Sequence, residues 1–366
     1  MSFAVIVPTM GLPHLVNFTE SLIRNWRGTG LVIYCYNPKE PKKAAETIAA
    51  VKNLHNQYPQ EGLTYMVLDL KVPRGFGGAV NAGARVIKMH EDCRKDTDTS
   101  YEQVIVLNDD ITLSAGWRDG LWNGHHIRQA HTQSTRAMTK IEKGHPTPAI
   151  EQLGGTVGIV GGVSFDVSGE QNIRAEKTLQ AFEALGVDEF SRQYKLANSG
   201  KYMRACFLSG FCMSFSMECF NDSWITTQTG DEGIFEDFPI GGFEDNDLCF
   251  RVQEKGYVLI IALDTYFHHN SHTTLNTYWK EEAKNGLHNR LRFYKKWEHL
   301  TQRDDQIIIA AYRLMFKCVN DLAQFRSSLI RAAQLGINGA AVLLTGDPLA
   351  VLESYDKNLI SQLPDL

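Results

Sequence analysis

Two acidic residues follow an apolar run that ends near residue 107. Asn108, Asp109 and Asp110 come directly after Val-Ile-Val-Leu, the pattern of a buried strand. Neighbouring carboxylates at the mouth of a sheet could hold a divalent cation that bridges two phosphates, and such hard oxygen ligands suit Mg2+ or Mn2+. The plainer alternative is a turn, because Asn and Asp often end strands by hydrogen-bonding their own backbone.

A glycine-rich segment joins a predicted strand to a predicted helix. It starts at Arg74 and contains Gly75, Gly78 and Asn81. Small residues at a helix N-terminus let backbone N–H groups approach phosphate or ribose closely, and Arg74 adds a positive charge. The spacing is not that of the dinucleotide motif G-x-G-x-x-G. A tight turn without any ligand would favour the same glycines.

Acidic residues also open a predicted helix near residue 244. Glu244 and Asp245 precede it in the segment Phe-Glu-Asp-Asn-Asp-Leu. Acids in a first turn stabilise any helix, so their role could be structural. A helix N-terminus also favours the ionised carboxylate, and Asp245 is therefore expected to act as a base that accepts a hydroxyl proton.

Histidines follow the last predicted strand of the core. His268, in Phe-His-His, is expected to be a further metal ligand at the edge of the sheet, although histidine pairs on surface loops are commonly inert. The Met and aromatic residues of the segment 207–220 are assigned to core packing. Gly210 is the exception there, as a point of close approach.

The elements that must position these groups alternate along the first part of the chain. Apolar runs predict strands at 3–7, 31–36, 65–68 and 104–107, and helical spacing predicts helices at 15–26, 39–55 and 79–89. Such alternation predicts a doubly wound α/β sheet, in which ligands bind where the loops after the strands converge.

The rest of the chain divides into three parts. Residues 120–204 are polar and are predicted to be an acceptor-facing insertion, with a strand at 157–160 and a helix at 177–190. Regular elements then return, predicted as strands at 207–217 and 258–262 and a helix at 247–255. Amphipathic helices are predicted at 275–297, 306–335 and 349–363. We therefore predict a domain over 1–300 and a helical region over 301–366 that could support a homodimer.

Composition excludes several classes of protein. The net charge of −5 gives no general attraction to nucleic acid. Seven scattered cysteines without a C-x-x-C pair favour reduced thiols in the cytoplasm and no zinc site. No apolar stretch approaches the roughly 20 residues that cross a bilayer, which predicts a soluble protein without a transmembrane segment.

Taken in order, the motifs resemble those of the GT-A glycosyltransferases, specifically family 2 inverting enzymes of the rhamnosyltransferase-like branch. The resemblance runs from Phe3 to about Trp297. The motifs are Val-Ile-Val-Pro-Thr at 5–9, Gly-Phe-Gly-Gly-Ala-Val-Asn at 75–81, Leu-Asn-Asp-Asp at 107–110, Leu-Ser-Gly at 208–210, Glu-Asp-Asn-Asp-Leu-Cys-Phe-Arg at 244–251 and Phe-His-His at 267–269.

The resemblance implies a GT-A fold, a Rossmann-like doubly wound mixed sheet, here with a C-terminal helical appendage. It implies inverting transfer of a hexosyl or pentosyl group from a nucleoside-diphosphate sugar to an acceptor hydroxyl. Asp110 and His268 would hold Mn2+ or Mg2+, Gly210 and Glu244 would lie on the acceptor side, and Asp245 would be the base. The implied donor-binding residues are Pro8, Thr9, Asn37, Arg74, Gly75, Gly78, Asn81, Asn108 and Asp109.

Two departures from the family pattern leave the nucleobase open. The family commonly has an Asp after its second strand, where this chain has Tyr36 and Asn37, and Asn108 replaces the first Asp of the D-x-D motif. The acceptor is open as well: a polysaccharide, a lipid-linked sugar, a protein side chain or a modified DNA base. The acidic net charge disfavours DNA.

Two other functions compete with the transferase. A nucleotidyltransferase would share the α/β layout, but the segment from Pro8 to Leu12 lacks the glycine-rich loop ending in Arg that such enzymes carry after the first strand. A catalytically inactive module could bind nucleotide or saccharide without turnover. The presence of Asp110, Asp245 and His268 argues against that module.

Overall fold

The computed structural model describes residues 2–38, 41–71, 74–93, 100–132, 149–167, 169–205, 207–238 and 242–269, together with 289, 292–293 and 296–297. The chain forms two compact units, one of residues 1–237 with 244–274 and the other of residues 238–243 with 275–366. Every candidate site residue lies in the first unit. The predicted helices after residue 301 lie outside the described residues.

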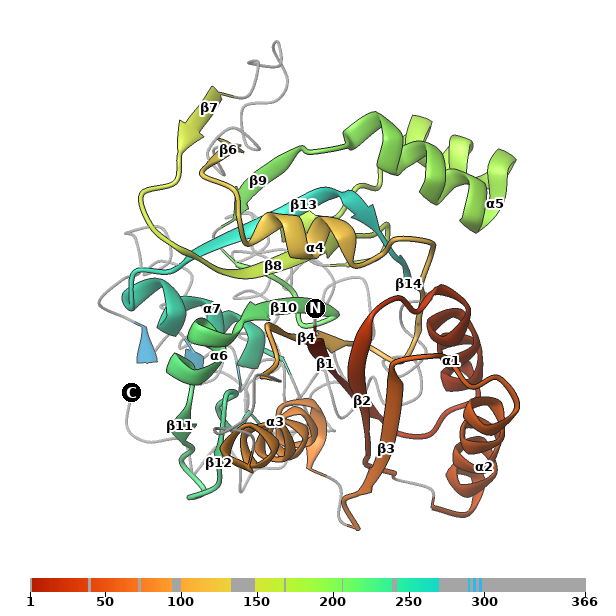
Figure 1. Ribbon diagram of the computed structural model, residues 1–366. Helices are drawn as coiled ribbons and strands as arrows, with labels where there is room; N and C mark the ends of the chain where they lie inside the picture. Colours follow the sequence, from red (N-terminus) through yellow and green to blue (C-terminus); the bar gives the residue numbers. More distant parts are fainter. Residues whose placement is uncertain are drawn as a thin grey trace, which may run out of the picture. The chain divides into compact units, whose positions relative to one another are not determined.

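A ten-stranded mixed sheet forms the core of the first unit (Figure 1). Its order is β3-β2-β1-β4-β10-β8-β13-β9-β6-β7. The first four of these strands run parallel, whereas β10 is antiparallel to both β4 and β8. The strands are β1 (Ser2–Thr9), β2 (Thr29–Tyr36), β3 (Leu63–Asp69), β4 (Gln103–Leu107), β6 (Gln129–Thr132), β7 (Ala149–Gln152), β8 (Val157–Val163), β9 (Tyr202–Ala205), β10 (Cys212–Ser216) and β13 (Val258–Tyr266). The predicted α/β class with a mixed sheet is confirmed.

Helices cover both faces of this sheet because its strands are apolar on both sides. Phe3, Val5 and Val7 of β1 pack in one cluster with α1 and α2, whereas Ala4 and Ile6 pack in the other with α3. Parallel strands buried on both faces read as continuous apolar runs, as β1 does. The helices are α1 (His14–Asn25), α2 (Pro41–Gln57), α3 (Gly75–Cys93), α4 (Asp119–Gly124), α5 (Glu176–Asn198), α6 (Met217–Asp222) and α7 (Glu244–Glu254).

Three local predictions differ from the structure. The glycine-rich turn is the first turn of α3, which begins at Gly75. The strand predicted over 207–217 is limited to β10, because the Ser216 hydroxyl accepts the Cys219 N–H and starts α6. The segment 120–204 contributes β8 to the middle of the sheet, between β10 and β13, so it is part of the core as well as a connection.

The strand order creates a switch point between β1 and β4. From β1 the sheet continues to β2 and β3 on one side, and to β4 on the other. The connections after β1 and β4 therefore diverge at their carboxyl ends, which is where the ligand-binding crevice lies in sheets of this type. The loops that carry Thr9 and Asp109 lie at this position, and a hydrogen bond joins their side chains.

Two short, two-stranded sheets lie outside the ten-stranded sheet. β14 (His268–His269) pairs with β5 (Ile111–Thr112), and β11 (Ile225–Thr226) pairs with β12 (Glu232–Gly233). Within the described ranges no helix combines the length and apolar character needed to cross a bilayer. Free thiols are found at Cys35, Cys93, Cys212, Cys219 and Cys249.

Gly11 turns the chain from β1 into α1. Its φ is +72°, and a Cβ there would lie 2.8 Å from both Ala44 Cβ and Tyr36 Cε2. We expect Gly11→Ala to lower the free energy of unfolding by about 2–4 kcal/mol through backbone strain and overlap, measured by urea denaturation. Gly230→Ala is the control, because Gly230 has a φ of +86° but open space around it, which limits the loss to about 1–2 kcal/mol. Equal losses in the two variants would contradict the packing argument.

Candidate active site

The loops that carry the predicted donor residues are bonded to one another at the carboxyl edge of the sheet. The Thr9 carbonyl accepts the backbone N–H of Asn37 at 2.8 Å. The Asn37 side chain then donates to the Gly75 carbonyl at 3.2 Å and accepts the Arg74 N–H at 2.7 Å. Asn37, which is 8% exposed, thereby joins the end of β2 to the start of α3.

The contacts continue from α3 to the catalytic candidate and back to β4. A Cβ on Gly210 would lie 3.1 Å from the Phe76 ring, so the helix and the 210 loop are in close approach. Asp245 Oδ2 accepts the Gly210 N–H at 3.0 Å. The next carbonyl, that of Phe211, accepts the Asn108 N–H at 2.9 Å. These loops and the Thr9–Asp109 bond form a closed ring of contacts, which we call the edge ring.

Asp109 closes the edge ring and is buried within it. Its Oδ2 accepts the Thr9 hydroxyl at 2.5 Å, and its Oδ1 lies 3.2 Å from His14 Nε2. The Thr9 hydroxyl oxygen also accepts the Gly11 N–H at 3.0 Å. Asp109 is 8% exposed. His14 is not predicted from the sequence, because no neighbouring residue marks a histidine whose partner lies 95 positions away.

Asp110 meets a different histidine. His269 Nε2 lies 3.0 Å from Asp110 Oδ1, and the Asn108 amide nitrogen is 3.5 Å from the same ring nitrogen. His269 Nδ1 lies 2.7 Å from the Asp166 carbonyl oxygen, to which it can only donate. This bond leaves Nε2 directed at Asp110, the arrangement that commonly orients a metal-binding imidazole.

The sequence predicts His268 as the metal ligand beside Asp110, whereas the structure pairs Asp110 with the neighbouring His269. The His268 ring stacks on Phe182 at 4.9 Å between centroids, and its Nδ1 is 3.3 Å from the Tyr266 hydroxyl. Adjacent residues of a strand point to opposite faces, so only one of the two rings can face the acidic pair. The strand register, which is a tertiary property, selects His269.

The acidic pair raises the pKa of both imidazoles. Burial lowers the pKa of His14, but hydrogen bonding to Asp109 and the charges of Asp109 and Asp110 outweigh burial and raise it above the usual value. In the same way, burial lowers the pKa of His269, and the Asp110 hydrogen bond and charge raise it further than burial lowers it. Both rings therefore hold a proton more readily than a free histidine.

Asp245 is part of the edge ring and lies in the first turn of α7. Its carboxylate accepts the Gly210 N–H and its Oδ1 accepts the Asn246 N–H at 2.8 Å. Burial is the largest effect and raises the pKa of Asp245, although these backbone bonds lower it. The helix N-terminus alone predicted a strongly ionised group, whereas burial shifts this carboxyl toward the range of a general base.

The other acids of this helix differ in role. Asp247 is fully buried and forms an ion pair with Arg251 at 2.9 Å, so it braces the helix. Glu244 is 6% exposed, and a Cβ on Gly77 would lie 3.7 Å from its Cγ, which places it against α3. Of the three acids in the first turn, Asp245 is the one bonded to Gly210 in the edge ring.

Two predicted donor residues are engaged elsewhere. The Asn81 amide bonds to the Ile234 N–H, the Phe235 N–H and the Phe235 carbonyl at 2.8–2.9 Å, so it anchors that segment to α3. Arg74 forms an exposed ion pair with Asp231 at 2.8 Å. Exposed pairs contribute only about 0–1 kcal/mol, so the Arg74 guanidinium is free to exchange toward an anion.

The remaining predicted donor residues lie next to the edge ring, and their side chains make none of its contacts. Pro8 is buried in β1 next to Thr9. Gly78 lies in the first turn of α3, where a Cβ would be 2.8 Å from Arg74 Cβ. A side chain at Gly78 would displace Arg74, so the glycine keeps the helix start accessible.

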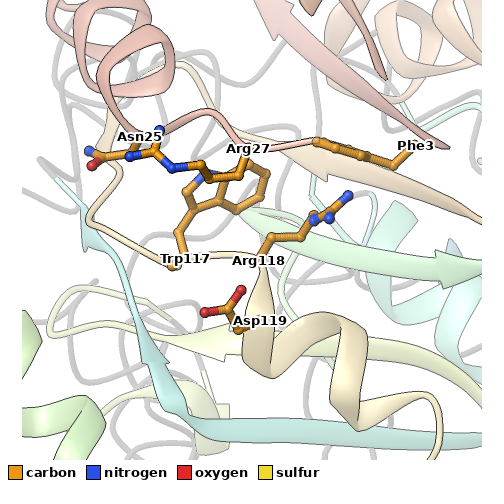
Figure 2. A pocket seen from close by; sticks show the side chains of 7 residues that line it. Phe3, Asn25, Arg27, Trp117, Arg118 and Asp119 are labelled. Atoms are coloured by element: carbon orange, nitrogen blue, oxygen red, sulfur yellow. The ribbon is translucent and has the colours of Figure 1, made fainter. Parts of the chain in front are cut away.

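A shallow pocket at the opposite end of β1 has a different character. It is lined by Phe3, Asn25, Arg27 and residues 116–119, whose side chains appear in Figure 2. The Arg118 guanidinium lies 3.8 Å from the Phe3 ring centroid, and Asp119 pairs with Lys195 at 2.8 Å. These groups are used in packing, and the pocket lies about 20 Å along the strand from Thr9.

The residues next to the edge ring could supply some, but not all, of the ligands of a divalent cation. Within the described residues no group of three or more His, Cys, Asp or Glu side chains could bind a metal by itself. Asp110 and His269 provide one carboxylate and one imidazole. Mg2+ in nucleotide enzymes is commonly held by one or two carboxylates, with substrate phosphates and water completing the shell. The residues present fit a cation that is bound together with a diphosphate.

Comparisons with known proteins give a distant structural likeness alone. No family model matches the chain, and no curated protein does. Glucosyl-3-phosphoglycerate synthase from Mycobacterium tuberculosis, in complex with Mn2+, uridine diphosphate and glucosyl-3-phosphoglycerate, has a TM-score of 0.37 and 12% identity over 80% of this chain and 79% of that chain.

Two further solved structures are similar at the same distance. The synthase complex with Mn2+, uridine diphosphate and phosphoglyceric acid has a TM-score of 0.35 and 13% identity over 80% of this chain and 78% of that one. A mycobacterial protein has a TM-score of 0.35 and 11% identity over 80% and 74%. Likeness this distant carries no conclusion about the substrate of this chain.

The raised pKa values predict how stability changes with pH. A histidine whose pKa is higher in the folded state stabilises the protein below pH 6.5, and this contribution is lost as pH rises through the folded pKa. The metal-free protein should therefore lose stability as the pH rises above 6.5, with a smaller loss in His269→Gln. Urea denaturation in a chelating buffer measures this, and an identical pH dependence in the variant would refute it.

Proposed function

We propose that this chain is a metal-dependent, inverting glycosyltransferase of the GT-A fold and of family 2, in its rhamnosyltransferase-like branch. It would move a hexosyl or pentosyl group from a nucleoside-diphosphate sugar to an acceptor hydroxyl. The edge ring carries the proposal, because the loop at Gly210 and Phe211 is bonded both to Asp245 and to Asn108, which precedes the acidic pair, and Asp110 of that pair contacts His269.

The donor would occupy the crevice between β1 and β4. Thr9, Asn37 and Asp109 would line the nucleoside end, and the start of α3 would present backbone N–H groups to the diphosphate. Asp110 and His269 would hold Mn2+ or Mg2+. A divalent cation there would offset the charge that develops on the departing nucleoside diphosphate. Arg74 would leave Asp231 to approach the same phosphates.

The acceptor would approach from the side of Gly210 and Glu244. Asp245 would accept the proton of the attacking hydroxyl while the oxygen bonds to the anomeric carbon and the bond to the diphosphate breaks. A base on the side opposite the leaving group gives inversion. The raised pKa of Asp245 suits this role, since a base works best when its pKa is near the working pH.

The predicted nucleotidyltransferase and inactive binding module differ from this proposal in what they turn over. A nucleotidyltransferase would transfer a nucleoside monophosphate from a nucleoside triphosphate to a sugar phosphate and release pyrophosphate, and an inactive module would bind without releasing a nucleoside diphosphate. Neither alternative needs a general base, the role that we propose for Asp245, a carboxyl with a raised pKa.

We also propose a domain over 1–300 and a helical region over 301–366. The C-terminal helices would support a homodimer, and the protein would be cytoplasmic.

A thermal-shift screen tests the proposal at the donor. Uridine, thymidine, guanosine, adenosine and cytidine diphosphates are each added with and without Mn2+, because a ligand of the native state raises the melting temperature. One diphosphate should stabilise the protein only with Mn2+, and its sugar conjugates then define the donor. A protein that responds to none of them would sink the proposal.

The two carboxylates should have separable roles. Asp245→Asn should lower the transfer rate at least ~100-fold while Mn2+-dependent nucleoside diphosphate binding is unchanged, because the variant loses the base alone. Asp110→Ala should lose binding and transfer together. Release of nucleoside diphosphate and isothermal titration measure the two properties. Normal turnover by Asp245→Asn would remove it as the base.

The two adjacent histidines provide a matched pair for the cation. His269→Ala should weaken Mn2+-dependent binding of nucleoside diphosphate by about 10- to 100-fold, as loss of a metal-ordering group does. His268→Ala should stay within a few-fold of the parent protein, because its ring stacks on Phe182. The reverse ranking in titration calorimetry would restore His268 as the ligand.

A further inference from the structure

We infer that His14 is a positioning residue that fixes the Asp109 carboxylate as an acceptor for ribose hydroxyls of the donor. The inference rests on the proposed function and extends it to a residue outside every motif of the sequence. It is carried by the contacts of Asp109, whose two oxygens are held by two different elements.

The first step is the immobilisation of the carboxylate. Thr9, at the end of β1, donates its hydroxyl to Oδ2, and His14, the first residue of α1, lies 3.2 Å from Oδ1. The side chains of His14 and Asp109 are 10% and 11% exposed, so little water competes for the contact. With one partner on each oxygen, the carboxylate plane cannot rotate without breaking a bond.

The Asp109 carboxylate can accept further hydrogen bonds besides those to Thr9 and His14. A carboxylate offers about four acceptor sites, two on each oxygen. Thr9 and His14 occupy one on each, which leaves acceptor capacity on both oxygens. Adjacent ribose hydroxyls are donors at a spacing that suits a bidentate carboxylate. An acceptor fixed before binding loses less entropy when the ligand arrives than a mobile one.

His14 contacts a different carboxylate from the one proposed to hold the cation. Asp109 is bonded to His14 and Asp110 to His269, and the two histidines come from different elements, α1 and β14. His14 therefore acts on the carboxylate that is already engaged by Thr9. Its loss should weaken binding of the nucleoside far more than binding of the diphosphate and cation, because Asp109 is its hydrogen-bond partner and Asp110 acts on it through charge alone.

The test compares ligands that contain and lack the ribose hydroxyls. Full-length parent protein, His14→Ala and His14→Gln are titrated with the nucleoside diphosphates of the thermal-shift screen, their 2′-deoxy and 3′-deoxy forms, and inorganic pyrophosphate, each with Mn2+. His126→Ala is the matched control, because His126 is exposed and contacts the Trp122 ring instead of the acidic pair. Melting temperatures are recorded for all four proteins.

The parent should prefer the ribonucleoside diphosphate to one of its deoxy forms. His14→Ala should bind the ribonucleoside diphosphate about tenfold more weakly and lose that preference, while pyrophosphate affinity stays within twofold. His14→Gln should recover part of the preference, because its amide can donate to Oδ1. His126→Ala should match the parent.

Three results would overturn the inference. Equal weakening of pyrophosphate binding would make His14 a phosphate or metal residue. An unchanged preference in His14→Ala would leave it without a role in positioning. A parent protein that binds no nucleoside diphosphate would remove the proposed function as well, and this outcome is distinct because it appears before any variant is compared.

Discussion

Two carboxylates buried side by side constrain the whole carboxyl edge of this sheet. Asp109 and Asp110 are 8% and 7% exposed, and ionised groups at such burial destabilise a fold unless each has a partner. The fold supplies one imidazole to each, from α1 and from β14. These two contacts fix the start of α1 and the strand β14 relative to the loop after β4. A bound cation would change this balance locally, at Asp110, while Asp109 keeps its own partners.

The rest of the edge is braced by amide side chains instead of charges. Asn37 joins the end of β2 to the start of α3, and Asn81 ties the segment at 234–235 to the same helix. An amide both donates and accepts, so one buried side chain can satisfy backbone groups of two loops. Such braces keep the crevice in place without adding charge near the acidic pair. They also explain why residues that resemble ligand contacts in sequence are used inside the protein.

Asp245 shows how position within the fold changes the chemistry of a residue. A carboxylate at a helix N-terminus is normally stabilised in its charged form. Here burial beside Gly210 and Phe76 has the larger effect and raises the pKa. Asp247, two residues later, is fully buried but is paired with Arg251. The same acidic turn thus contains one structural carboxylate and one that is suited to proton transfer.

Sequence by itself determined the alternating elements, because apolar periodicity and turn residues act over a few positions and need no knowledge of the whole fold. It also placed the acidic pair at the end of β4 and Asp245 at the start of α7. Tertiary structure alone decided that His269 and not His268 meets Asp110, that His14 meets Asp109, and that β8 lies in the middle of the sheet. These outcomes depend on strand order and register between segments that are far apart in the sequence, such as His14 and Asp109 at a separation of 95 positions. The direction of the Asp245 pKa shift depends on burial, which the packed chain creates collectively and no short segment contains.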